Sequence, residues 1–187
     1  MTFDFGPARL NMVESQVRTN DVTDVAIHDA MRAIPREDYC GGKLHLAYAD
    51  AEVEFAPGEY LLRPRDLAKL VHSLRAKAGE TALAIAAPYA AAVLRHIGLT
   101  VEEAADAPDG AAGRFDVVIC EGAVAEIPAA WLAALGVGGR LAVIERTGPV
   151  GKAKLYLRTA DDLGGRVVFD ATPPYLKGFE PRKSFAF

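Results

Sequence analysis

The chain has 187 residues, of which 51% are hydrophobic and 25% are charged, and its 21 Lys and Arg against 25 Asp and Glu give a formal net charge of −4. A chain of this length buries roughly 70% of the surface that its unfolded form exposes, so its core needs no metal ion or disulfide. The acidic balance and the lack of a long basic run exclude the electrostatic signature of proteins that bind nucleic acid or anionic membranes. We therefore expect neither a nucleic-acid nor a membrane partner, while the oligomeric state stays open.

Cysteine spacing and the composition of the first residues bear on metal binding and location. Cys40 and Cys120 belong to no Cys-x-x-Cys or Cys/His pattern, which argues against a zinc site and against a disulfide framework. No segment approaches the ~20 consecutive apolar residues that a membrane-spanning helix needs. The first residues lack the charged start and apolar run of a secretory signal, so we expect a cytoplasmic protein.

The first third of the chain is predicted to be helical. Apolar residues recur at helical spacing over 10–17 and again over 25–34, and Asn20-Asp21 separates the two runs. We expect two short helices before the core. The second is predicted to be capped by Asp21 or Thr23, because their side-chain oxygens can accept the free N–H groups of its first turn.

A longer helix is predicted from Pro64 to Gly79. Proline suits the first helical position because the N–H that it lacks would be unpaired there, and Leu67, Leu70 and Leu74 then trace an apolar stripe. The residues before it, 39–64, are irregular and rich in Gly and Pro, which predicts a structured connector with short extended pieces.

After residue 79, apolar strands alternate with helices. We predict strands at 81–85, 99–102, 115–120 and 138–144, and helices at 89–97 and 128–135. Continuously apolar strands in such an alternation imply an α/β fold with a doubly wound, mostly parallel sheet, in which ligands bind beyond the carboxyl ends of the strands. Alternating residues at 153–158 and 166–170 predict an antiparallel hairpin at the sheet edge.

Segments in this order resemble the protein-L-isoaspartate O-methyltransferase family, and they cover almost the whole chain. The first three segments are the most specific: Met12-Val-Glu-Ser-Gln-Val-Arg18, Met31-Arg-Ala-Ile-Pro-Arg-Glu37, and Ala47-Tyr-Ala-Asp50 with Pro57-Gly58 and Pro64. The others are Phe115 through Leu141, which includes Ile127-Pro128 and Gly138-Gly-Arg-Leu141, and a tail with Gly178-Phe179 and Phe185-Ala-Phe187.

The resemblance implies one Rossmann-like methyltransferase domain over 1–187. Residues 1–78 would form its N-terminal helical and substrate-side region, and residues 79–187 would form the Rossmann-like core. The implied cofactor is S-adenosylmethionine, and the implied partner is a damaged protein or peptide whose isoaspartyl carboxylate is methylated. Because the sulfonium methyl is already activated, such an enzyme mainly holds oxygen and methyl carbon in line at ~3 Å and excludes water.

The chain departs from the family in the cofactor loop. Members follow the first core strand with an acidic residue and a Gly-x-Gly-x-Gly turn, since glycine admits positive φ and lets N–H groups approach the ligand. Here Ala84 takes the acidic position, Ala86 takes the first glycine, and Pro88 removes an N–H donor. We expect these side chains to close the space beyond Ile85 to a nucleoside.

Two further departures concern the substrate turn and the length of the chain. Leu62 stands where the family carries the Ser or Thr that assists methyl transfer, so no catalytic residue is assigned. Only eleven residues separate Glu103 from Phe115, where the family fits a helix and a further strand. A βαβ crossover needs about a dozen residues or more, so the sheet is predicted to be shortened by one crossover.

Four residues are candidates for contacts to the cofactor. Tyr89 keeps the family pattern, and Glu102, with its neighbour Glu103, stands where a family acid holds the ribose hydroxyls. Asp109 and Gly110 resemble the turn beside the adenine. The residues alone also fit an exposed acidic strand end and a solvated turn, and both interpretations stay open.

Three residues are candidates for contacts to a substrate. Arg63 and Arg65 replace the family's substrate turn with two guanidinium groups suited to carboxylates, at a helix start where positive charge is mildly unfavourable. Glu121 follows a buried strand at the ligand end of the sheet. Surface charge and a polar loop position are the alternative explanations, and no metal ligand is predicted.

The sequence leaves three functions open. The chain is either an active isoaspartyl methyltransferase, a catalytically inactive methyltransferase-like binding or regulatory module, or a protein that binds a different small anion near Arg63 and Arg65. The loss of the glycines, the hydroxyl and the crossover favours the inactive module.

Overall fold

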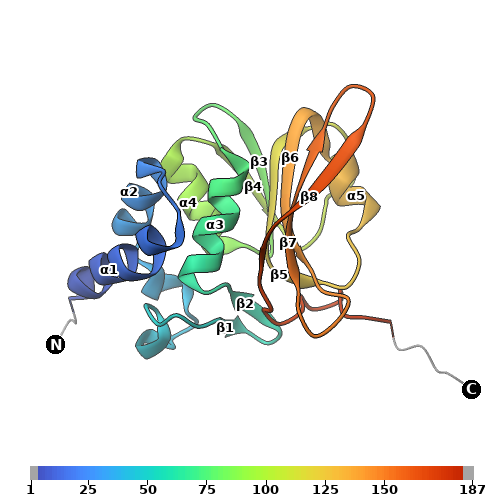
Figure 1. Ribbon diagram of the computed structural model, residues 1–187. Helices are drawn as coiled ribbons and strands as arrows, with labels where there is room; N and C mark the ends of the chain where they lie inside the picture. Colours follow the sequence, from blue (N-terminus) through green and yellow to red (C-terminus); the bar gives the residue numbers. More distant parts are fainter. Residues whose placement is uncertain (1–3, 183–187) are drawn as a thin grey trace, which may run out of the picture.

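The computed structural model describes residues 4–182 and forms a six-stranded sheet with helices against its faces (Figure 1). The strand order is β4-β3-β5-β6-β7-β8, with β3, β4, β5 and β6 parallel and the last two strands antiparallel. The bounds are β3 (Thr81–Ile85), β4 (Thr100–Ala104), β5 (Phe115–Val124), β6 (Leu135–Glu145), β7 (Lys152–Arg158) and β8 (Leu163–Asp170). The predicted α/β fold with an antiparallel edge hairpin is confirmed.

The N-terminal helices form two runs, as predicted. The first comprises α1 (Gly6–Met12), the π-helical segment η1 (Val13–Val17) and the 3-10 turn η2 (Arg18–Asn20), and the second is α2 (Val25–Ala33). The predicted cap of α2 is wrong, because Asp24 supplies it by accepting the N–H of Ala26 at 2.9 Å. Asp21 instead takes a left-handed φ of 62° and ends the preceding turn.

The connector holds two short 3-10 turns, η3 (Arg36–Tyr39) and η4 (Leu44–Leu46), and a hairpin of β1 (Val53–Ala56) and β2 (Glu59–Leu61). The next helix, α3 (Pro64–Leu74), begins at the proline as predicted but ends before Gly79. Arg75 takes a left-handed φ of 48°, which stops the helix. The remaining helices are α4 (Pro88–Ile97) and α5 (Ala129–Ala133).

The sheet buries both of its faces, which explains the continuous apolar runs in its strands. Val117 and Ile119 of β5 belong to the core that α2, α3 and α4 cover. Val118 and Cys120, on the same strand, belong to the second core, which Trp131 of α5 closes. Alternate residues of one strand therefore serve two cores.

The connection from β4 to β5, residues 105–114, contains neither helix nor strand, so β4 forms one edge of the sheet. The predicted loss of one crossover is confirmed. The C-terminal tail instead crosses the end of β5, where Leu176 donates its N–H to Ala123 and Ala123 donates to Pro174. The Phe185-Ala-Phe187 motif lies outside the described residues.

Among residues 4–182, no helix has the length and apolar character needed to cross a bilayer. The same residues contain no group of three or more His, Cys, Asp or Glu side chains placed to hold a metal ion.

Candidate functional site

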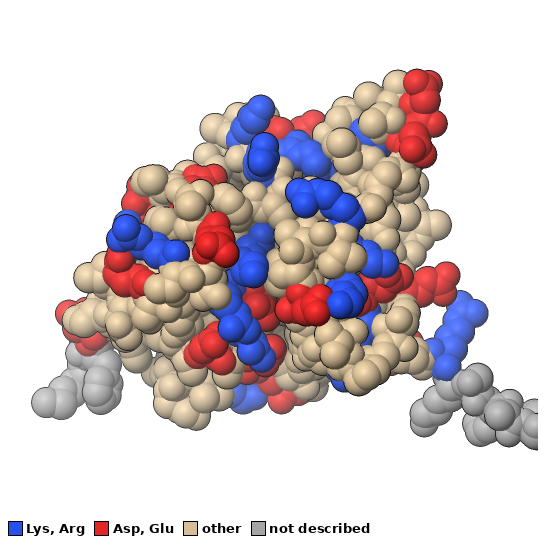
Figure 2. Space-filling model, in the orientation of Figure 1, with Lys and Arg blue, Asp and Glu red and all other residues tan. Residues whose placement is uncertain are grey.

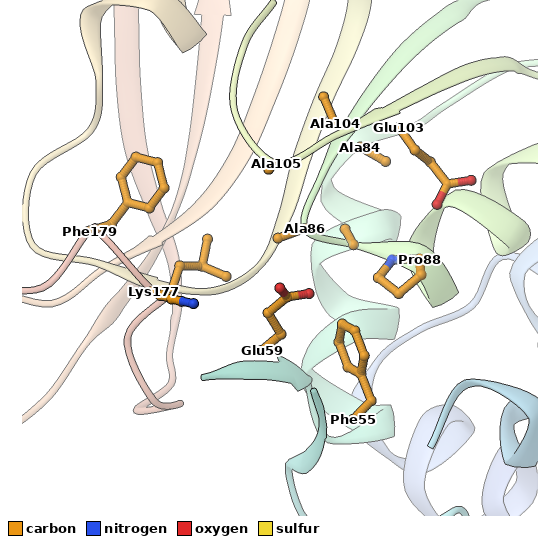
Figure 3. Close-up of a pocket in the computed structure, with 12 residues that line it drawn as sticks. Phe55, Glu59, Ala84, Ala86, Pro88, Glu103, Ala104, Ala105, Lys177 and Phe179 are labelled. Atoms are coloured by element: carbon orange, nitrogen blue, oxygen red, sulfur yellow. The ribbon is translucent and has the colours of Figure 1, made fainter. Parts of the chain in front are cut away.

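A cavity of about 550 Å³ opens beyond the carboxyl ends of β3 and β4 (Figure 3). It lies where the sequence predicts a ligand site in a parallel sheet. Its walls come from the β3–α4 loop, the end of β4, the β1–β2 hairpin and the tail, and the lining residues are Phe55, Glu59, Ala84, Ala86, Ala87, Pro88, Glu103, Ala104, Ala105, Leu176, Lys177 and Phe179. The expectation that side chains close this space is wrong, because Pro88 only lines it and Tyr89 is fully buried in the core.

Most N–H groups of the loop between β3 and α4 are hydrogen-bonded within the protein. Ala86 has a left-handed φ of 46° and donates its N–H to the carbonyl of Ala104 at 2.8 Å. Pro88 has no N–H, and the backbones of Tyr89 and Ala90 hydrogen-bond to the carboxylate of Glu121, the latter at 2.7 Å. Three of the four N–H groups at positions 86–90 are therefore bonded internally.

Glu121 is the carboxylate at the N-terminus of α4. It projects from β5, is 0% exposed and also accepts the N–H of Leu62 at 3.1 Å. The partial positive charge of a helix N-terminus favours an anion. Burial nevertheless raises the pKa of Glu121 to about 6, against the opposing effect of Arg36 and the backbone donors. The carboxylate of Glu121 therefore occupies the start of α4, where an anionic ligand could otherwise bind.

The positive charge of Arg36 offsets the negative charge of Glu121. The guanidinium is fully buried, donates to the carbonyls of Ala47 and Leu62 at 2.8 and 2.7 Å, and lies 4.9 Å from the ring centre of Tyr89. Its Nη1 atom and the Tyr89 hydroxyl have no hydrogen-bond partner in the described chain. Burial is the main reason why the pKa of Tyr89 is raised.

The turn at Leu62 is held by both charged groups. Its carbonyl accepts from Arg36, its N–H donates to Glu121, and its apolar side chain is 0% exposed. The backbone of this turn is therefore fixed by buried hydrogen bonds, and the side chain of Leu62 carries no reactive group.

The structure separates the two candidate acids of β4. Glu103 lines the cavity and pairs with Arg95 at 2.5 Å, whereas Glu102 lies outside the lining and pairs with Arg114 at 2.9 Å. Asp109 and Gly110 sit in a turn of the β4–β5 connection and do not line the cavity either. Of these candidate residues, only Glu103 lines the cavity.

The two arginines proposed for substrate binding are engaged within the protein. Arg63 forms two hydrogen bonds to Glu52, at 3.0 and 3.2 Å, and lies 3.4 Å from Asp66. Arg65 donates to Asp66 at 3.1 Å and lies 3.9 Å from Asp50. These contacts neutralise the positive charge at the start of α3.

The sequence did not predict four side chains of the cavity. Phe55 and Glu59 come from the hairpin, and Lys177 and Phe179 come from the tail. Glu59 and Lys177 reach into the cavity from different walls (Figure 3). The only sequence signal for them was the membership of Pro57-Gly58 and Gly178-Phe179 in the resembling segments, since neither segment is near residue 86 in the chain.

The lining of this cavity mixes apolar and charged groups. It combines aromatic and aliphatic walls with two carboxylates and one ammonium group, and its described residues include no Ser, Thr, Cys or His. Shape, stacking and charge can therefore select a ligand.

Known proteins resemble this chain in sequence and in fold. The protein-L-isoaspartate O-methyltransferase of Methylorubrum extorquens is 33% identical, over 83% of this chain and 81% of its own length. The protein-L-isoaspartate O-methyltransferase 1 of Rhodopseudomonas palustris is 34% identical, over 72% of this chain and 50% of its own length. No model of a known protein family matches the chain.

Solved structures agree at the level of the fold. A protein-L-isoaspartate O-methyltransferase from Plasmodium falciparum, in complex with S-adenosyl-L-homocysteine, superposes with a TM-score of 0.71 at 14% identity, covering 90% of this chain and 98% of that chain. A second structure named protein-L-isoaspartate O-methyltransferase gives a TM-score of 0.70 at 19% identity, covering 91% of this chain and 66% of that chain. With the sequence relatives, this shows that the chain belongs to the protein-L-isoaspartate O-methyltransferase family, as a divergent member.

Proposed function

We propose that this chain is a family member that binds a neutral, nucleoside-sized ligand in the cavity and does not transfer methyl groups. The observation that carries the proposal is the β3–α4 loop, where three of the four N–H groups at positions 86–90 are bonded to Ala104 and Glu121. The proposal makes the protein a binding or regulatory module built on a methyltransferase fold.

S-adenosylmethionine does not fit the residues of this loop. When bound to a methyltransferase it supplies an activated methyl group and carries a carboxylate on its methionine part. Here a β-carbon stands at the positive-φ position of Ala86, Pro88 offers no donor, and the N-terminus of α4 already holds the carboxylate of Glu121. The carboxylate of a bound methionine group would therefore not find these donors free at the start of α4, because Glu121 already uses them.

The lining of the cavity suits the nucleoside part of such a cofactor without its methionine part. Glu103 can accept hydrogen bonds from ribose hydroxyls, and the rings of Phe55 and Phe179 line the walls. A volume of about 550 Å³ falls within the usual range of small-molecule sites, ~300–1,000 Å³.

The second candidate function is methyl transfer to isoaspartyl residues, as the names of the relatives state for those proteins. The observation in its favour is that the cavity is open at the family's ligand end of the sheet. It requires a cofactor position that uses neither the loop N–H groups nor the start of α4.

Two measurements on the full chain separate the candidates. We expect calorimetry to show binding of adenosine and no binding of S-adenosylmethionine or S-adenosylhomocysteine. We also expect transfer of labelled methyl to an isoaspartyl peptide to equal that of a boiled sample, with a relative that has the glycine loop as positive control. Micromolar affinity for S-adenosylmethionine, or methylation above the boiled sample, would overturn the proposal.

A matched pair of variants tests the position of the ligand. Glu103→Gln replaces a charged acceptor in the cavity by a neutral one and should weaken adenosine binding about tenfold, which corresponds to ~1.4 kcal/mol. Glu102→Gln makes the same change on the adjacent residue outside the lining and should leave the Kd unchanged. Equal effects of the two variants would place the ligand elsewhere.

A further inference from the structure

A second cavity, of about 310 Å³, lies between α3, β8 and the turn at Asn20 and Asp21. It faces the C-terminal half of α3, away from the Leu62 turn that precedes this helix. The residues that line it are Asn20, Asp21, Lys69, His72, Ser73, Arg75, Arg166 and Val168. None of them belongs to the cavity beyond β3 and β4.

Three cationic side chains meet at this cavity without ionic partners. No carboxylate of residues 4–182 forms an ion pair with Lys69, Arg75 or Arg166, and Asp21 is the one acid in the lining. Lys and Arg side chains gather along the line where α3 meets β8 (Figure 2). A local excess of positive charge therefore stands on a protein whose net charge is −4.

The cavity is also lined by His72, and its lysine is held in place by an aromatic ring. Lys69 holds its ammonium group 4.6 Å from the ring centre of Phe169, which fixes it beside the cavity.

The helix dipole explains only part of this charge. The C-terminus of a helix carries partial negative charge and favours a cation within its last turn, which accounts for Arg75. Lys69 lies more than one turn earlier, and Arg166 comes from a different element, β8. Their positive charge is therefore not offset by the end of this helix.

We propose that this cavity binds a phosphate monoester. A dianionic phosphate offers oxygen acceptors to the two guanidinium groups and the ammonium group, and Arg in particular matches phosphate geometry with paired N–H donors. A volume of about 310 Å³ lies at the lower end of the usual range for small-molecule sites, ~300–1,000 Å³, so there is room for a small organic group beside the phosphate. The site is independent of the function proposed for the first cavity.

Calorimetry on the full chain at low ionic strength tests the proposal with three probes: glycerol 3-phosphate, inorganic phosphate and glycerol. We expect glycerol 3-phosphate to bind and glycerol not to bind. Equal affinity for inorganic phosphate would identify the free ion as the ligand, and weaker affinity would identify the phosphorylated molecule. Absence of binding by both phosphates would overturn the proposal.

Charge-matched variants show whether the site is specific. Arg166→Gln should weaken binding about tenfold, which corresponds to ~1.4 kcal/mol, because it removes a charge-assisted hydrogen bond. Arg158→Gln removes the same charge from the partner strand of the same hairpin, outside the lining, and should leave the Kd unchanged. Arg166 is exposed on the edge strand, so its substitution should leave the fold intact, which circular dichroism checks.

The histidine gives a readout that general charge attraction would not move. Saturating glycerol 3-phosphate should shift the nitrogen-15 resonances of the His72 ring, because this side chain lines the cavity. Equal weakening by Arg166→Gln and Arg158→Gln, with no shift at His72, would show that only diffuse surface charge attracts the anion.

Discussion

The carboxylate of Glu121 couples stability to pH in an unusual direction. Its pKa is about 6 in the folded protein, raised by burial from the 4.5 that is usual for a glutamate. Between these two values the folded state holds the proton more tightly than the unfolded state. The contribution of Glu121 to stability is therefore present below pH 4.5 and is lost as the pH rises through 6, by about 2 kcal/mol in total.

We predict that this slope disappears in Glu121→Gln. Denaturant unfolding of both proteins between pH 4.5 and 7 should show the stability of the wild type, relative to the variant, falling by about 2 kcal/mol over this range. The comparison cancels carboxylates such as Glu80 and Asp116, whose pKa values are lowered by their partners and which titrate in both proteins. A difference that is constant with pH would contradict the prediction.

Ala86 carries backbone strain that a glycine would relieve. Its φ of 46° lies in the left-handed region, which costs a residue with a β-carbon about 1–2 kcal/mol. Its neighbour Ala87 has a φ of −134° and carries no such strain. We predict that Ala86→Gly is more stable than Ala87→Gly by at least about 1 kcal/mol, because glycine raises the unfolded-state entropy in both. Thermal unfolding of the pair measures the difference, and equal stabilities would refute the strain.

At the scale of elements, the β4–β5 connection contains no helix and is anchored by a side-chain hydrogen bond to the buried tryptophan. Asp106 accepts a hydrogen bond from the indole Nε1 of Trp131, which is fully buried under this connection. We predict that Asp106→Ala costs about 1.5–3 kcal/mol, the usual contribution of a hydrogen bond to a charged group. Trp131 is the only tryptophan, so its fluorescence follows the unfolding directly.

Asp109→Ala is the matched control for this anchor. It removes the same side chain from an exposed turn of the same connection, and we expect a change within about 0.5 kcal/mol. If both variants were equally stable, the connection would be held by its apolar contacts, such as Ala111, and not by the indole hydrogen bond.

Local patterns were enough to predict most elements of the fold. The continuous apolar runs of β3, β5 and β6 are confirmed, because both faces of these strands are buried. The predicted start of α3 is confirmed as well, because a proline at the first helical position is a local signal. The cap of α2 and the end of α3 were missed, since one depends on which of several neighbouring oxygens reaches the first turn and the other on a left-handed arginine.

The candidate site was harder to predict because it is assembled from remote segments. The loss of the glycine loop was visible in the sequence, but the cavity persists because the hairpin and the tail form its other walls. The role of Glu121 depends on a contact between the end of β5 and the start of α4. Side-chain contacts between parallel strands and distant loops leave no period in the sequence, so neither feature could be read from spacing.

At the scale of the whole molecule, Arg140 ties the N-terminal region to the sheet. From β6 it donates to the carbonyls of Leu74 and Arg75, at 2.9 and 3.2 Å, and pairs with Glu80 at 2.9 Å. The core under α2, α3 and α4 also contains residues of β5 and β6. The described parts of the two regions, residues 4–78 and 79–182, therefore share one hydrophobic core, and we expect them to unfold together.

We predict a single cooperative transition for the chain. Trp131 reports the face of the sheet that α5 covers, whereas far-UV circular dichroism is dominated by helices on the other face, so coincident urea midpoints from the two probes would establish cooperativity. Arg140→Ala should lower both midpoints together, with a loss of about 2–3 kcal/mol for its charged hydrogen bonds. Arg114→Ala breaks a largely exposed pair, with 47% and 39% of the two side chains accessible, and should cost at most about 1 kcal/mol. Midpoints that separate in Arg140→Ala would show that the N-terminal region unfolds as a unit of its own.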